Sequence, residues 1–158
     1  MSDVDVDALR GVVRQILHEG HAELRLVVSD LDAAALGWRP AADANSIAAL
    51  TAHALDAERF LVSTAAGIDV ERAREAQFRI TVDGPAELLA LIDRLEGEVD
   101  GYLEQVTADR LTTPVERPGR VHEGAWWLLH ALEHTREHVG QATLTRQLYE
   151  QRAPAPTA

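Results

Sequence analysis

Apolar residues recur at spacings of three and four in separate stretches of this chain, which is the period of an amphipathic α-helix. In the first stretch the pattern is carried by Leu9, Val12, Val13, Ile16 and Leu17. The stretches expected to be helical are residues 3–35, 46–67, 85–106 and 123–149. Because each helix can bury its apolar stripe only against another element, the pattern predicts an all-α, four-helix bundle.

Residues that start and stop helices bracket these stretches. Gly37 and Pro40 are expected to end the first helix, Asn45 or Ser46 to cap the second, and Pro85 to lie near the first position of the third. The connections at 68–83 and 107–122 are long for neighbouring antiparallel helices. We therefore expect irregular loops, the first with one helical turn, and at least one crossing over the end of the bundle.

The overall composition limits the classes of function. A chain of 158 residues fits one domain, which we place at residues 1–150, followed by a proline-rich tail at 151–158 that is expected to be disordered. A net charge of −11 repels nucleic acid and anionic membranes, so neither is an expected partner. With no signal-type segment and no apolar run of the ~20 residues that a membrane span needs, we expect a cytoplasmic protein.

Cysteine is absent, which excludes disulfides, thiolate ligands and a nucleophilic cysteine. The remaining strong signal is histidine in the last helical stretch. His134 and His138 are four residues apart, so both side chains lie on one face of a helix and can reach one metal ion. His53 lies in the apolar pattern of the second helix and is the expected third ligand. Three imidazoles would leave metal positions open, as in catalytic sites.

Other interpretations of these residues remain open. Histidines on an apolar helix face are often core residues satisfied by a hydrogen bond. The segments His130–His134 and His134–His138 also match the H-x-x-E-H pattern of inverzincin proteases, although the chain offers little room for a substrate cleft.

Several polar neighbours could support a metal site. Asp56 and Gln141 each lie three residues after a candidate ligand. There each could fix the tautomer of a ligand histidine or hold bound water, or could simply be a polar residue at the rim of the site. His130, one turn before His134, could line the pocket or bond a backbone carbonyl. We expect Glu58 to pair with an arginine, and His21 to be an ordinary side chain.

Several short segments of this chain occur together and in a fixed order. They are Gly37-Trp38-Arg39-Pro40, Asn45-Ser46-Ile47, His53 with Glu58, Arg72 to Arg79 with Phe78, and His134 with His138-Val139-Gly140-Gln141. Taken together, these segments resemble the DinB-like family of metal-binding four-helix bundles, in particular its actinobacterial branch related to mycothiol-dependent transferases. The resemblance covers residues 5–150.

This resemblance implies an up-down-down-up bundle, a homodimer, and one divalent metal ion, zinc or nickel, on His53, His134 and His138. It also implies a transferase that joins a low-molecular-weight thiol of the mycothiol type to a small electrophile. The alternative is a non-catalytic stress-response protein that binds a metal or another ligand. No motif identifies a catalytic acid or base, so the catalytic residues stay unknown.

Overall fold

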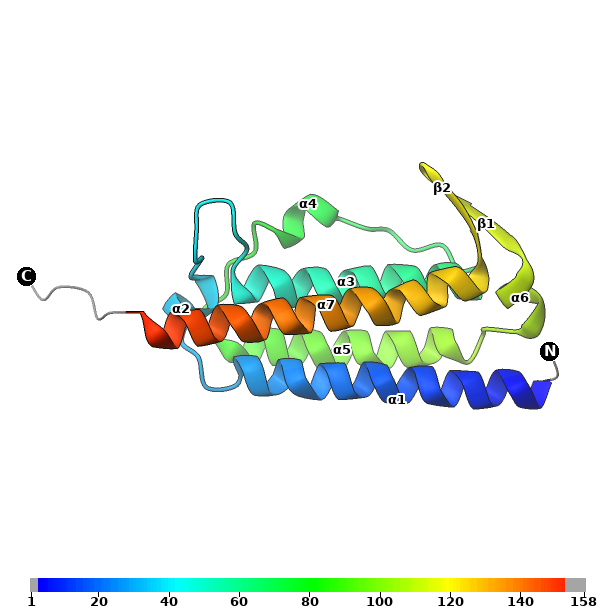
Figure 1. The fold of residues 1–158 in the computed structure, drawn as a ribbon, viewed down its shortest axis with the longest axis horizontal. Helices are drawn as coiled ribbons and strands as arrows, with labels where there is room; N and C mark the ends of the chain where they lie inside the picture. Colours follow the sequence, from blue (N-terminus) through cyan, green and yellow to red (C-terminus); the bar gives the residue numbers. More distant parts are fainter. Residues whose placement is uncertain (1–2, 153–158) are drawn as a thin grey trace, which may run out of the picture.

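Four long helices form the molecule. The computed structural model describes residues 3–152 of the chain, and the side chains of residues 5–152. The long helices are α1 (Asp3–Val28), α3 (Ile47–Ala66), α5 (Pro85–Leu103) and α7 (Gly124–Gln151). α1 and α7 run in one direction along the bundle, and α3 and α5 run in the other (Figure 1). The fold is therefore the predicted up-down-down-up bundle.

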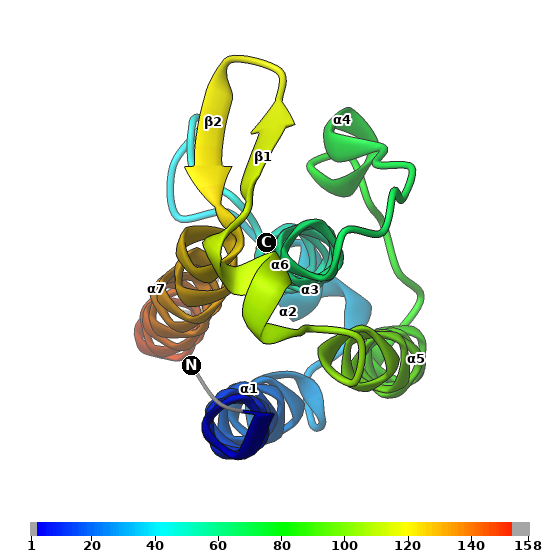
Figure 2. The same cartoon turned by 90° about the vertical axis from the view of Figure 1, so that its right-hand side faces the viewer.

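The helices occupy the corners of a square when the bundle is viewed from its end (Figure 2). α3 packs against both α7 and α5, and it is buried along nearly its whole length. Its small residues, such as Ala49 and Ala54, allow this close approach. No helix in residues 3–152 has the length and apolar character needed to cross a membrane.

The first helix is shorter than the sequence predicts. α1 ends at Val28, and the chain turns before forming α2 (Ala33–Gly37), so the prediction of one continuous helix to residue 35 was wrong. The Asp32 carboxylate accepts a hydrogen bond from the Ala35 backbone N–H at 2.8 Å, which starts a new helix. This turn buries Leu31 and Leu36 in the core.

The connection between α3 and α5 runs outside the bundle. Because these two helices are parallel, residues 67–84 must return along their whole length (Figure 1). The segment carries one turn of helix, α4 (Arg74–Gln77), as predicted. We call residues 67–84 the crossover segment.

The connection between α5 and α7 was not predicted correctly. It contains α6 (Ala108–Thr112), which lies across the end of the bundle, and an antiparallel hairpin of β1 (Pro114–Arg117) and β2 (Arg120–Glu123) (Figure 2). Gly119 permits the tight turn with its positive φ of 78°. Helix α7 extends to Gln151, which the prediction had placed in the tail at 151–158, and residues 153–158 lie outside the described residues.

A layer of polar side chains divides the core into two apolar clusters. His21 of α1 is fully buried, and its Nε2 and Nδ1 each lie 2.9 Å from a carboxylate oxygen, of Glu58 and Glu96 respectively. The hydroxyl of Thr135 donates to the second oxygen of Glu58 at 2.8 Å. The layer thus joins all four long helices, and the expectations that His21 is ordinary and that Glu58 pairs with an arginine were wrong.

The two carboxylates determine the charge of His21. Only the imidazolium form has two N–H donors, and both ring nitrogens face carboxylate oxygens. Burial opposes this charge, but the hydrogen bonds and attraction from Glu58 and Glu96 outweigh it and raise the pKa of His21.

We predict that His21→Gln lowers the free energy of unfolding by roughly 3 kcal/mol at pH 6, because Glu58 loses its buried cationic partner. A raised folded-state pKa stabilises the protein fully below the unfolded value of about 6.5, and this contribution is lost as pH rises through the folded value. The difference between wild type and variant, measured by urea denaturation, should therefore shrink with increasing pH.

His18→Gln is the matched control, because His18 pairs with Asp100 at a partly exposed position. It should cost less than about 1 kcal/mol. A difference for His21→Gln that stays constant from pH 6 to pH 10 would contradict the role of the imidazolium.

Candidate metal centre

Three histidines meet between α3 and α7. His53 comes from the middle of α3, and His134 and His138 come from successive turns of α7. One nitrogen of each ring lies within 4.8 Å of the others, and the ring centroids are 4.4 to 5.1 Å apart. No other such group of three histidine, aspartate or glutamate side chains occurs in the described part of the chain. These three side chains could hold one metal ion.

Two of the rings are oriented by glutamine amides. The Nδ1 atom of His53 lies 2.9 Å from Oε1 of Gln77, and Nδ1 of His138 lies 2.7 Å from Oε1 of Gln141. Because an amide oxygen can only accept, Nδ1 of each ring carries the proton and Nε2 keeps the free lone pair. Both rings are thus held in a form that can bind a metal.

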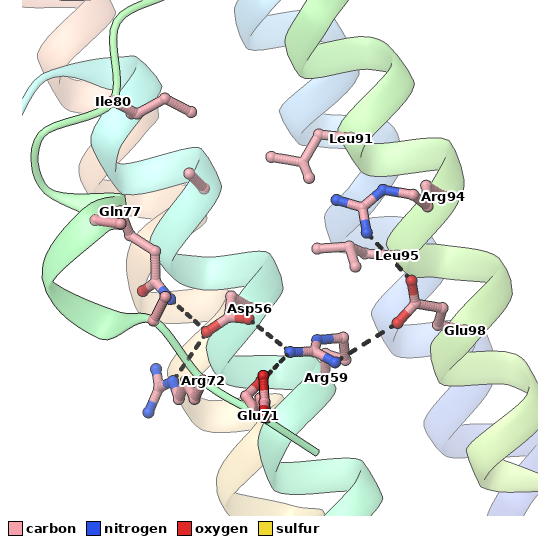
Figure 3. A pocket seen from close by; sticks show the side chains of 13 residues that line it. Asp56, Arg59, Glu71, Arg72, Gln77, Ile80, Leu91, Arg94, Leu95 and Glu98 are labelled. Carbon is pink, nitrogen blue, oxygen red and sulfur yellow. Dashed lines mark hydrogen bonds and ion pairs between the residues drawn. The ribbon is translucent and has the colours of Figure 1, made fainter.

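Asp56 acts on this site only through other residues. It does not contact a histidine, as the sequence had suggested it could. Instead it accepts hydrogen bonds from the Gln77 amide nitrogen and from Nε of Arg72, the latter at 3.0 Å, and pairs with Arg59 at 3.1 Å (Figure 3). Gln77 comes from the crossover segment, 24 residues beyond His53. No local spacing could therefore have identified it.

His130 lies beside the three candidate ligands and is not one of them. Its ring centroid is 6.0 Å from that of His134, and its Nδ1 bonds the Glu133 carboxylate at 3.0 Å instead of a backbone carbonyl. Its ring packs against Trp126, while Trp127 is buried in the core. His130 lines a cavity of about 520 Å³ that opens beside His53 and His134.

The surroundings of His134 and His53 disfavour the charged form of both rings. Burial, together with repulsion from His138 and His53, lowers the pKa of His134 to about 3. Burial also lowers the pKa of His53, and the nearby Arg72 adds to the effect. The Nδ1 atom of His134 is buried and has no hydrogen-bond partner among the described residues. Neutral imidazoles with a buried, unsatisfied nitrogen suit a cation, so the residues fit a divalent metal.

The bundle and its histidine group together define the class to which this protein belongs: four-helix bundles with a group of three histidines between two adjacent helices. A family model of the DinB superfamily matches residues 16–142 of the chain. The chain belongs to the DinB superfamily, as its sequence motifs suggested. The match does not distinguish the mycothiol-related branch.

Solved structures share the fold. A conserved protein from Enterococcus faecalis is similar with a TM-score of 0.75 and 16% identity, over 90% of this chain and 97% of that one. A DinB-like protein from Bacillus subtilis gives 0.68 and 18%, over 92% and 95%. A DinB-like protein from Bacillus cereus gives 0.70 and 14%, over 92% and 95%. No match was found among curated proteins.

We predict that the His134 ring of metal-free protein stays neutral between pH 5 and pH 8, because its burial disfavours the charged form. The measurement is an NMR titration of the ring protons. The same ring in urea-unfolded protein should titrate near the ordinary value of about 6.5. A midpoint between 6 and 7 in the folded protein would show that the ring is not desolvated.

Proposed function

We propose that His53, His134 and His138 bind one divalent metal ion, zinc or nickel, and that the protein is a metal-dependent transferase. Its substrates would be an external low-molecular-weight thiol, of the mycothiol type, and a small electrophile. The observation that supports this proposal most strongly is the convergence of three imidazoles, with one ring nitrogen of each lying within 4.8 Å of the others. Imidazole is a suitable ligand for both metals.

The donor set favours a catalytic role over a purely structural one. Three histidines leave at least one position of a tetrahedral ion for an exogenous ligand, whereas closed structural sites use four protein ligands. A bound divalent ion would supply the positive charge that ionises a thiol at neutral pH. The chain has no cysteine, so any thiol at this site must come from outside.

The chain's own residues would shape the reaction space. Gln77 and Gln141 hold two rings in the form that can bind a metal, and the partly buried Asp56 carboxylate holds Gln77. The cavity beside the rings is lined in part by Phe60, Leu61 and Trp127, whose apolar surfaces would exclude water from a thiolate and an electrophile.

We predict that tag-free protein binds one equivalent of zinc or nickel, and that His53→Ala, His134→Ala or His138→Ala abolishes stoichiometric binding. Gln77→Ala should weaken affinity by about 10- to 100-fold, as loss of a hydrogen bond to a metal ligand usually does. Competition with a chelator would measure this. His122→Ala is the control, because that histidine stacks on Trp126 away from the group. Full metal binding by the His134→Ala variant would rule out this site.

We further predict that the metal-loaded protein accelerates the reaction of a small thiol with monobromobimane. The thiolate sulfur forms a bond to the bromomethyl carbon, bromide leaves, and the thiol proton goes to the buffer. The product is followed by fluorescence with mycothiol, cysteine and glutathione, and the His53→Ala variant is the control. Stoichiometric metal without turnover above that control would favour the alternative, a non-catalytic metal-binding protein.

A further inference from the structure

The cavity beside the histidines is positively charged in an otherwise acidic protein. Arginines 72, 74, 117 and 120 line it together with His53, His130 and His134, and none of its lining residues is acidic. The whole chain has 26 acidic residues and 15 arginines. A cavity wall with four arginines and no carboxylate therefore has a charge opposite to that of the chain as a whole. A bound metal ion would add two more positive charges.

Two segments outside the four-helix core supply these arginines. Arg72 and Arg74 belong to the crossover segment, and Arg117 and Arg120 lie on either side of the hairpin turn. Figure 2 shows the hairpin and α4 projecting from the same side of the bundle, next to α3 and α7. The arginines therefore reach the cavity from two directions around the rings.

Much of this charge is not neutralised by the protein. Arg74 and Arg120 form no ion pair with any described residue, and Arg117 pairs only with the highly exposed Asp69. Arg72 pairs with Asp56 through Nε, while its Nη2 atom is buried without a hydrogen-bond partner among residues 5–152. An unsatisfied buried guanidinium nitrogen is costly, and an oxyanion would satisfy it.

Phe60 holds two of the arginines in place. The guanidinium carbons of Arg72 and Arg117 lie 5.3 and 5.9 Å from the centroid of its ring, which is cation–π distance. The Nε atom of Arg117 also donates to Thr64 at 3.2 Å. These contacts restrict both side chains and so lower the entropic cost of ordering them around a ligand.

A second, larger cavity also contains arginines, but carboxylates in its wall neutralise their charge. It has a volume of about 820 Å³ and lies between α3, α5 and the crossover segment (Figure 3). There Arg59 pairs with Asp56 and Glu98, and Arg94 pairs with Glu98, so acidic and basic groups alternate. An anion entering this cavity would meet carboxylates, which makes it a natural internal control.

We propose that the cavity beside the histidines binds a small molecule that carries two or more carboxylate groups, with Arg72 and Arg117 as its main contacts. Arginine suits this ligand because its planar guanidinium can donate two parallel hydrogen bonds to one carboxylate. The inference builds on the proposed function, since the carboxylates would belong to either the thiol or the electrophile. The affinity of the cavity for an anion is nevertheless measurable without turnover.

Isothermal titration of the full-length protein with succinate at constant ionic strength tests the inference, with and without bound metal. Succinate should bind saturably in both forms, and neutral succinamide should not. The double substitution Arg72→Gln with Arg117→Gln should weaken binding by at least about tenfold, since each removes charge-assisted hydrogen bonds. Arg94→Gln removes the same charge from the other cavity and should change binding less than about twofold.

A second double substitution, Arg74→Gln with Arg120→Gln, tests the inference independently if the first double variant does not fold. Both side chains are exposed and form no ion pair among the described residues, so the fold should persist while succinate affinity falls. Succinate binding unchanged in both pairs, or equally weakened by Arg94→Gln, would overturn the inference.

Inhibition kinetics then identify which substrate carries the carboxylates. Succinate that competes with the thiol assigns them to the thiol, and succinate that competes with the electrophile assigns them to the electrophile; either result supports the inference. Absence of turnover with intact succinate binding would refute the transferase proposal and leave the anion site standing. Turnover without succinate binding would refute the anion site and leave the transferase proposal standing.

Discussion

The burial of Glu58 is the constraint on which the bundle depends. A carboxylate in a helical core is strongly unfavourable unless its oxygens are paired, and here His21 and Thr135 provide the partners while Glu96 satisfies the other side of His21. Because hydrogen bonds need defined distances, this layer fixes how far each of the four helices is shifted along its neighbours. Apolar packing alone is less selective, since small shifts exchange one aliphatic contact for another.

The same register determines where the histidines meet. His53 precedes Glu58 by little more than one turn of α3, and His134 adjoins Thr135 on α7. Once Thr135 is bonded to Glu58, the faces that carry His53, His134 and His138 are brought together on the side toward the crossover segment. The candidate metal centre is therefore supported from within the core by a polar layer, and from outside by Gln77 and Gln141.

Charge is distributed unevenly around this centre. The whole chain has a net charge of −11, whereas the cavity beside the histidines is lined by arginine and lacks carboxylates. The field near the rings is thus opposite to that of the molecule as a whole. Such a cavity would favour anions locally while the acidic exterior repels polyanions such as nucleic acid. The cavity would therefore bind small anions that can enter it, whereas the acidic exterior would repel large ones.

The sequence by itself determined the long helices, because apolar periodicity is a local property, and it singled out the three histidines through spacing and family motifs. Tertiary structure alone decided the rest. The hairpin, the break before α2 and the partnerships of Glu58 and Gln77 depend on contacts between residues far apart in the chain. Spacing predicts which side chains share a face of one helix, but the register between helices is set only when the whole core packs together.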